Sequence, residues 1–449
     1  MSKLNRPTDH SVRTHEGAKA VANLTAEQIL RRSVMSCLLW EDQFYENGKS
    51  IADRIVENAR LVEPTYLAAL AEEVRHKANL RHAPLLLLDV LSEFPKRTNL
   101  RGDYNHGIIS DAIARTISRP DELSEFLAIY WRNGRKTVSH QVRKGLAQAF
   151  GKFSEYSLAK YDRDGAIKLR DVMRIVHPKP ENEEKSAIYK KVLDRTLTTP
   201  DTWEVALSGG ADKKETFERL LREGKLGYFA LIRNLRNMEQ ANVDRRLVID
   251  AILARKNGAD KILPFRFVAA ARAAPSFEAA LDESLIASIG EMEKFSGSTG
   301  IYVDVSGSMR DRLSAKSDLS RMDAACALAA VFPAERKNLR TFSFSNRTVE
   351  VPTRVGMSGI DAINRSQPHS GTNLGDAVND ANGRNFDRII VITDEQSHQR
   401  VPEPKAKHAY MINVASYHNG VGYGNGWNHI DGFSESIFKW IKEVETTGY

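Results

Sequence analysis

The sequence predicts two fold classes in one chain: an all-helical part over residues 25–297, followed by an α/β part over 298–449. In the first part, apolar residues recur at three- and four-residue spacing, as at Leu30 and Val34, without the alternation typical of strands. In the second part, short apolar runs alternate with helical patterns, which favours a parallel sheet covered by helices. A polar stretch, 1–24, precedes both parts and is predicted to be a loosely held arm.

The helical part divides into short helices at recognisable start and stop signals. Thr25 and Thr199-Pro200 are suited to the beginnings of helices, because threonine caps the first turn and proline fits its first position. Residue pairs that contain glycine, such as Gly209-Gly210 and Asn257-Gly258, mark the ends of helices. These signals give on the order of fifteen helices at ordinary lengths. A series of this kind without strands predicts stacked helical pairs, an α-solenoid.

The α/β part is predicted to be a doubly wound, Rossmann-like domain. Its apolar runs are short and bounded by turn residues, as strands buried on both faces should be. The strands are expected at 300–305, 339–344, 388–393 and 409–414, and the helices at 322–332, 374–382 and 433–445.

Composition excludes several classes of protein. The chain has 449 residues, of which 41% are hydrophobic and 27% charged, as in globular proteins. No apolar run approaches the roughly 18–20 residues of a membrane-spanning helix, and the first residues lack the apolar centre of a secretory signal. Two cysteines exclude a disulfide framework and a multi-cysteine zinc site. We therefore expect a cytoplasmic protein that does not enter membranes.

The excess of positive charge lies entirely in residues 1–297, the arm and the helical part together. The net charge is +7, and residues 298–449 contain 17 basic and 17 acidic side chains. Residues 131–154 carry six lysines and arginines and no acid, and a further basic group follows over 160–179. Such a cluster is typical of a phosphate-binding surface, and the alternative is a solvated helix face.

A motif at the end of the first predicted strand indicates a metal site. Asp304-Val-Ser306-Gly-Ser308 follows that strand, Thr372 stands in Ser-Gly-Thr-Asn before a helix, and Asp394 follows a later strand. The carboxyl ends of parallel strands meet at one edge of a sheet, where ligands bind. All five side chains offer hard oxygens, which favour Mg²⁺, with Mn²⁺ or Ca²⁺ as alternatives. The competing interpretation is that these polar residues close strand ends without metal.

This order of motifs resembles the metal-ion-dependent adhesion site (MIDAS) of von Willebrand factor A (vWA) domains. The resemblance covers about residues 298–449. By it, Ser306 and Ser308 would bind the ion directly, Thr372 directly or through water, and the two aspartates would supply charge. Glu395 stands where many such domains have glycine. It could bind the ion or face solvent, so it is not included among the ligands.

The helical part is similar to the TROVE module of the Ro ribonucleoprotein family, which includes the Ro autoantigen and the bacterial form Rsr. The matching segments are Arg13-Thr-His-Glu-Gly-Ala, Leu38-Leu-Trp-Glu, Leu158-Ala-Lys-Tyr, Leu169-Arg-Asp-Val, Val176-His-Pro-Lys-Pro, Leu231-Ile-Arg-Asn-Leu-Arg-Asn-Met, Leu263-Pro-Phe-Arg-Phe, Met411-Ile-Asn-Val-Ala-Ser-Tyr and Trp427-Asn-His-Ile-Asp-Gly-Phe-Ser. Together they span nearly the whole chain, whose length resembles the bacterial forms.

The family resemblance implies a monomeric ring of HEAT-like repeats that binds RNA without catalysis. Members bind Y RNA on an outer basic surface and 3′ single-stranded ends of misfolded RNA in a central hole. Bacterial relatives associate with the 3′–5′ exoribonuclease polynucleotide phosphorylase. The implied role is a scaffold in RNA quality control, processing or decay. The RNA-contact candidates are Arg135, Lys136, Arg143, Lys144, Tyr161, Lys168, Arg170, Arg174 and His177.

Several of these assignments have alternatives. Tyr161 could stack on a base or pack within its helix, and His177 could contact RNA or end a helix. The polar group Arg233, Asn234, Arg236 and Asn237 could bond neighbouring repeats or RNA, and Arg266 could face the cavity or an internal carboxylate. Two other functions remain. One is a metal-dependent adaptor that captures an acidic group of a partner protein, and the other is a metal-dependent hydrolase with His369 or His398 as the base.

Overall fold

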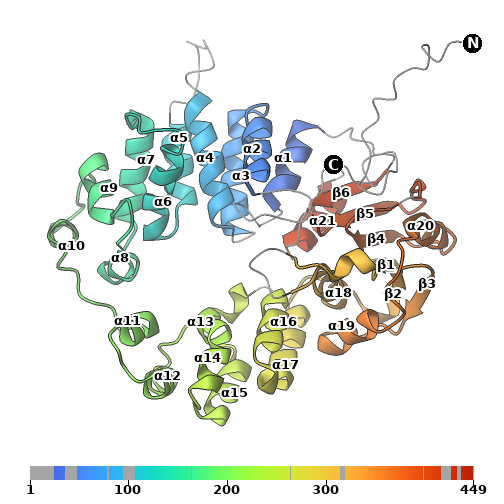
Figure 1. Ribbon diagram of the computed structural model, residues 1–449. Coiled ribbons are helices and arrows are strands. Elements are labelled where there is room, and N and C mark those ends of the chain that lie inside the picture. The colour runs from blue at the N-terminus through green and yellow to red at the C-terminus, as the bar shows by residue number, and fades with distance from the viewer. Residues whose placement is uncertain are drawn as a thin grey trace, which may run out of the picture. The chain divides into compact units, whose positions relative to one another are not determined.

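The structure is a computed structural model, shown in Figure 1, and the chain divides into two compact units. One unit is built mainly from residues 52–226 and the other from residues 227–449. The described residues are 25–35, 48–77, 80–94, 107–162, 164–262, 264–313, 319–397, 399–415, 426–431 and 436–447. The predicted arm over 1–24 lies outside them.

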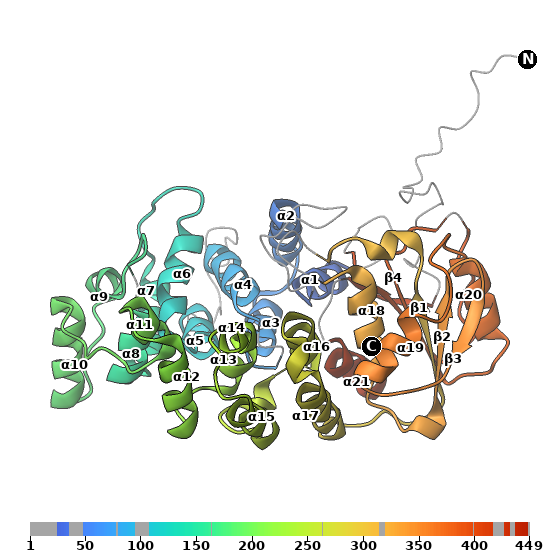
Figure 2. The ribbon, with the colours of Figure 1, turned by 60° about the horizontal axis from the view of Figure 1, so that its bottom comes forward.

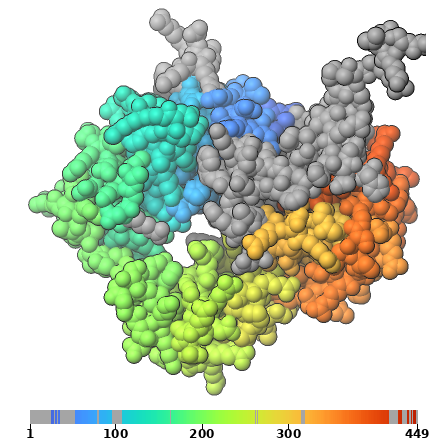
Figure 3. All heavy atoms as spheres, viewed as in Figure 1, coloured from blue at the N-terminus to red at the C-terminus, as the bar shows by residue number. Residues whose placement is uncertain are grey.

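The first unit consists of helices in its described residues. Consecutive helices pack in a regular way: α3 contacts α4 and α5, α4 contacts α6, and α5 contacts α7. Figure 3 shows these helices as spheres coloured from blue to green. Their bounds are α1 (Ala26–Met35), α2 (Gly48–Ala59), α3 (Pro64–His76), α4 (His82–Glu93), α5 (Ile108–Thr116), α6 (Pro120–Tyr130), α7 (His140–Gly151), α8 (Glu155–Tyr161), α9 (Leu169–Val176), α10 (Glu183–Asp194), α11 (Trp203–Ser208) and α12 (Lys213–Arg222).

Helix α7 approaches α5 closely because of one glycine. A Cβ atom on Gly145 would lie 2.7 Å from the carbonyl oxygen of Ser110 and 2.8 Å from Cβ of Ile113. Any larger residue would therefore force the two helices apart. The position of α7 along the chain is set by Ser139, whose hydroxyl accepts a hydrogen bond from the amide of Val142 at 3.4 Å.

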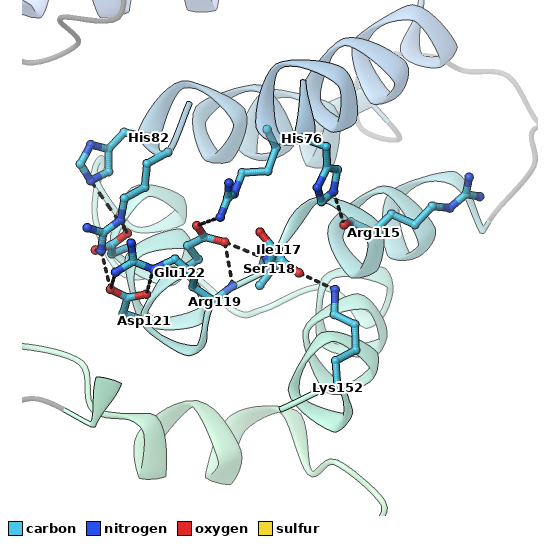
Figure 4. Close-up of polar contacts among 12 residues, drawn as sticks. His76, His82, Arg115, Ile117, Ser118, Arg119, Asp121, Glu122 and Lys152 are labelled. Atoms are coloured by element: carbon cyan, nitrogen blue, oxygen red, sulfur yellow. Dashed lines mark hydrogen bonds and ion pairs between the residues drawn. The ribbon is translucent and has the colours of Figure 1, made fainter. Parts of the chain in front are cut away.

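A buried carboxylate joins α3 to the start of α6 (Figure 4). The Glu122 side chain is fully buried, and its Oε1 lies 2.8 Å from Nη2 of Arg75. Its Oε2 accepts hydrogen bonds from the amides of Ser118 at 2.8 Å and Arg119 at 3.1 Å. Glu122 therefore satisfies the free amides at the beginning of α6 and neutralises an arginine of a neighbouring helix.

The second unit begins with five helices and continues into the sheet. The helices are α13 (Tyr228–Arg233), α14 (Leu235–Gln240), α15 (Arg245–Ala254), α16 (Pro264–Ala273) and α17 (Glu278–Gly290). Tyr228 anchors α13, because its buried hydroxyl donates to the carbonyl oxygen of Ile252 at 2.7 Å. In the described residues from 25 to 294, no strand is present, as the sequence predicts.

The sheet has six strands in the order β3-β2-β1-β4-β5-β6. All neighbours pair in parallel except β2 and β3, which are antiparallel. The chain therefore reverses its winding direction between β1 and β4, the place where open α/β sheets bind ligands. The strands are β1 (Thr299–Asp304), β2 (Leu339–Phe344), β3 (Thr348–Val351), β4 (Arg388–Thr393), β5 (His408–Asn413) and β6 (Asn428–Asp431).

Helices cover both faces of this sheet. Figure 2 shows α18 (Arg321–Ala330) and α19 (Met357–Asn364) on one side and α20 (Leu374–Asn382) on the other. Alternate residues of the strands, such as Tyr302 and Val391, form a core with α20. The last helix, α21 (Ser436–Thr447), packs Phe438 edge-on against Phe332.

The four predicted strands and three predicted helices of this part are confirmed with small shifts of their ends. The strands β3 and β6 and the helix α19 were not predicted. No helix among the described residues is long and apolar enough to cross a bilayer.

Candidate functional site

Three of the predicted RNA contacts are exposed cations on two adjacent helices. Arg143 and Lys144 lie in the first turns of α7, and Arg174 lies in the last turn of α9, which packs against α7. All three side chains are exposed, and none forms an ion pair with the described residues. Positive charge near a helix beginning opposes the helix dipole, so Arg143 and Lys144 do not serve to stabilise α7. They are available to an anionic ligand.

Other predicted contacts are already engaged within the protein. The Lys168 ammonium lies 2.7 Å from Asp164, and Arg170 lies 4.0 Å from Asp171. Lys136 lies 3.9 Å from the buried Asp89 and 4.0 Å from the centre of the Tyr130 ring. Arg135 is exposed, and its guanidinium lies 5.0 Å from the Trp131 ring. RNA would have to compete with these partners.

Two predicted contacts have structural roles as well. The half-buried Tyr161 ring is covered on one face by the Arg119 guanidinium, 4.5 Å from its centre. His177 ends α9 in the left-handed conformation, with φ of 49°, and its side chain is exposed. Lys152, in the same acid-free stretch, donates to the carbonyl oxygen of Ile117 just after α5 (Figure 4). It also donates to the carbonyl oxygen of Ala114.

The second polar group contains an exposed aromatic ring that the sequence did not single out. Phe229 on α13 is 42% exposed. The guanidinium groups of Arg233 and Arg266 each lie 5.7 Å from the centre of this ring, and both arginines are exposed. Arg236 instead donates to the carbonyl oxygen of Ala273 at 3.2 Å, which joins α14 to α16.

The predicted metal ligands from β1 lie at the carboxyl edge of the sheet. Asp304 is fully buried at the end of β1. Its Oδ1 accepts from the amide of Ser306 at 2.8 Å, and its Oδ2 accepts from the Thr393 hydroxyl at 2.6 Å. The hydroxyls of Ser306 and Ser308 are 3.3 Å apart. Adjacent strands β1 and β4 thus bring Asp304 and Asp394 to the same edge.

The two aspartates lie close enough to affect each other's charge. Burial and the negative charge of Asp394 raise the pKa of Asp304 to about 7, although hydrogen bonds from Ser306 and Thr393 oppose the rise. Burial also raises the pKa of Asp394, against a hydrogen bond from Ser308 and the positive charge of Arg321. Two buried carboxylates beside two hydroxyls are a hard-oxygen set that fits a divalent cation of the Mg²⁺ type.

The loop that contains Thr372 is joined to the turn at this edge of the sheet. The amide of Gly307 donates to the carbonyl oxygen of Ser370 at 2.9 Å, which joins the loop to the turn after β1. The Thr372 side chain is half-buried. Within the described residues, no group of three or more His, Cys, Asp or Glu side chains could hold a metal.

Two further residues beside the predicted site could not be assigned from the sequence. Glu395 is fully buried, adopts a φ of 57°, and its carboxylate contacts Nε2 of His429 on β6. It does not face solvent.

The two candidate bases of a hydrolase are placed as follows. Nδ1 of His369 lies 2.8 Å from the carbonyl oxygen of Val305, and His398 lies outside the described residues.

The arginine Arg321 is the other unassigned residue at this edge. It is the first residue of α18, is 1% exposed, and lies 3.5 Å from the Asp394 carboxylate. The only sequence signal for its position is Ser320-Arg-Met-Asp323, which begins α18 as a capping box. That signal places the helix but does not show that the arginine points inward.

Comparisons with known proteins identify related sequence and fold. Residues 195–316 match the family model described as the TROVE domain. The crystal structure of the Ro (Rsr) protein of Deinococcus radiodurans superposes with a TM-score of 0.63 at 16% sequence identity. The match covers 94% of this chain and 100% of that one. The similarity of structure shows a shared fold of helices and a mixed six-stranded sheet.

Proposed function

We propose that the chain is a member of the Ro ribonucleoprotein family, as its TROVE-domain match supports, and that it binds RNA through the exposed cations Arg143, Lys144 and Arg174. These side chains lie on the adjacent helices α7 and α9 without ion pairs among the described residues, and this observation carries the proposal. Lysine and arginine heads neutralise phosphates without reading the base sequence. By the family resemblance, the proposed ligands are a structured small RNA of the Y type and single-stranded 3′ ends.

The finer parts of the proposal follow from the family. The stacked helical pairs are interpreted as an α-solenoid of HEAT-like repeats, and the sheet part as a vWA-type domain. A scaffold role in RNA quality control, a cytoplasmic location, a monomeric state and association with polynucleotide phosphorylase remain predictions. Catalysis is not part of the proposal, because two carboxylates beside serine hydroxyls suit ligand capture better than water activation.

A second contact is proposed for unpaired nucleotides. The exposed ring of Phe229 offers a stacking surface, and Arg233 and Arg266 beside it offer cations for the adjoining phosphates. An aromatic ring beside two arginines suits any base, since every base has a flat π-face. This contact would favour single strands over duplexes.

Salt dependence of RNA binding tests the proposal. We expect the logarithm of the association constant for a labelled single-stranded RNA to fall with the logarithm of salt concentration, with a slope of about −2 or steeper. Three neutralised phosphates at about 0.7 each account for that slope. Fluorescence anisotropy at several salt concentrations measures it. Affinity that does not change with salt would contradict the phosphate contacts.

We also propose that Asp304, Ser306, Ser308, Thr372 and Asp394 bind Mg²⁺, with Mn²⁺ or Ca²⁺ as alternatives. The supporting observation is that two buried carboxylates and two hydroxyls meet at the β1–β4 edge. When bound, the ion would supply a positive centre for an acidic group of a partner protein. The serines would contribute neutral oxygens, and Asp304 would hold the turn through its bond to the Ser306 amide.

Replacing Asp304 by asparagine is expected to lower Mn²⁺ affinity about tenfold or more, because the site loses one of its two negative charges. Electron paramagnetic resonance of free Mn²⁺ measures the change. The matched control is Asp376→Asn, at an exposed aspartate on α20 of the same unit. Equal affinities for wild type and Asp304→Asn would remove Asp304 from the ligand set.

A further inference from the structure

A buried arginine lies inside the predicted metal centre. The Arg321 side chain is 1% exposed, and it is among the largest fully buried side chains of the described residues. Its Nη1 lies 3.5 Å from Oδ2 of Asp394 and 3.4 Å from the carbonyl oxygen of Ser308. Its Nη2 lies 3.9 Å from Oδ2 of Asp311. A guanidinium is buried at such a place only when anionic and carbonyl oxygens surround it.

The fold delivers this side chain to the site through the beginning of α18. The Ser320 hydroxyl accepts from the amide of Asp323 at 3.0 Å, and the Asp323 carboxylate accepts from the amide of Ser320 at 3.1 Å. The amide of Arg321 itself donates to the carbonyl oxygen of Asp311 at 2.9 Å. The backbone on both sides of Arg321 is therefore fixed, and the guanidinium is held at Asp394 by the structure of the turn.

The arginine changes the charge that an incoming ion meets. Asp304 and Asp394 together carry two negative charges when ionised, and Arg321 compensates one of them. Both oxygens of Asp304 already accept hydrogen bonds, and Oδ2 of Asp394 lies 3.5 Å from Nη1 of Arg321. A divalent cation would bind beside a fixed positive charge in a buried region, where repulsion between like charges is weakly screened.

We propose that Arg321 is an internal counter-ion of this site, which keeps the domain folded without metal and lowers its affinity for divalent cations. The proposal rests on the metal site of the proposed function, and its ligand class is a hard divalent cation such as Mg²⁺ or Mn²⁺. Under this proposal, Arg321 and the divalent ion have different roles. Arg321 stabilises the paired carboxylates at all times, and the ion binds weakly and exchangeably on top of it.

The variant Arg321→Met tests the proposal, because methionine fills similar space without charge. In the full-length protein, we expect wild type to unfold at the same temperature in chelator and in about 5 mM MgCl₂. Arg321→Met should unfold at a lower temperature in chelator and recover in MgCl₂. Its affinity for Mn²⁺, measured by titration calorimetry, should be about tenfold or more above that of wild type.

Two controls separate a loss of charge compensation from a loss of packing. Arg310→Met removes an exposed arginine of the same turn and should change neither quantity. The double variant Arg321→Met/Asp394→Asn removes both partners, so it should regain wild-type thermal stability in chelator and lose the response to MgCl₂. If Arg321→Met fails to fold, a folded double variant still supports the counter-ion, and an unfolded double variant overturns it.

Different results would overturn the counter-ion role of Arg321 and the proposed metal site. If wild type and Arg321→Met bind Mn²⁺ equally, the counter-ion role is overturned and the metal site stands. If neither protein binds Mn²⁺, and MgCl₂ changes the unfolding temperature of neither, both proposals are overturned.

Discussion

Replacing Arg143, Lys144 and Arg174 by glutamate is expected to lower RNA affinity about 100-fold or more at moderate salt. The change removes three cations from one surface and adds three anions, so phosphates lose three contacts and meet repulsion. The salt slope should become less steep by about 2. None of the three side chains has an ion-pair partner among the described residues, so the folded unit should keep its stability.

The matched control reverses three other lysines of the same unit. Lys190 on α10 and Lys213 and Lys214 on α12 are also exposed, and their replacement by glutamate changes the net charge equally. Anisotropy with one labelled RNA measures both triple variants, and circular dichroism confirms their folding. An equal loss in both would mean that net charge, rather than the α7–α9 surface, determines affinity.

Replacing Glu122 by alanine is expected to destabilise the first unit by about 3–5 kcal/mol. The carboxylate is fully buried against Arg75, which is 13% exposed, and it accepts from the amides of Ser118 and Arg119. Alanine would leave a buried guanidinium without its anion and two amides at a helix start without their acceptor. Denaturant unfolding followed by circular dichroism measures the change.

The control for this variant is Glu72→Ala on helix α3. Glu72 forms a surface pair with Arg115 at 3.8 Å, and the two side chains are 41% and 64% exposed. Its removal should change the free energy of unfolding by at most about 1 kcal/mol. If Glu122→Ala were as stable as Glu72→Ala, the buried contacts at the start of α6 would not hold helices α3 and α6 together.

The sequence predicts the elements that have strong local signals. The run Ile389–Ile392 is apolar throughout, so β4 is recognisable without its neighbours. In contrast, β3 is four residues long at the edge of the sheet, mostly half-buried or exposed, and lacks such a run. The helix α19 begins after Gly356, at φ of 73°, without a capping side chain. Its start signal is therefore absent from the sequence.

The sequence predicts which types of residue form the candidate sites. It predicts only in part which of those side chains remain available to a ligand. The ion pair of Lys168 with Asp164 joins near neighbours in sequence, but Lys136 lies beside Asp89, from a distant helix. Which cations remain available for RNA is therefore a property of tertiary packing. The same holds for Arg321, because its capping box indicates a helix start and says nothing about the buried carboxylate that its side chain meets.

Ultraviolet cross-linking of the full-length protein to RNA in its own cells, followed by mass spectrometry of the cross-linked peptides, tests the central claim most directly. We predict cross-links concentrated in peptides of residues 131–179, which contain α7 to α9, with a second group around Phe229. Their loss from 131–179 in the Arg143, Lys144 and Arg174 glutamate variant would locate the RNA-binding surface. Cross-links confined to residues 298–449, or no RNA above background, would contradict it.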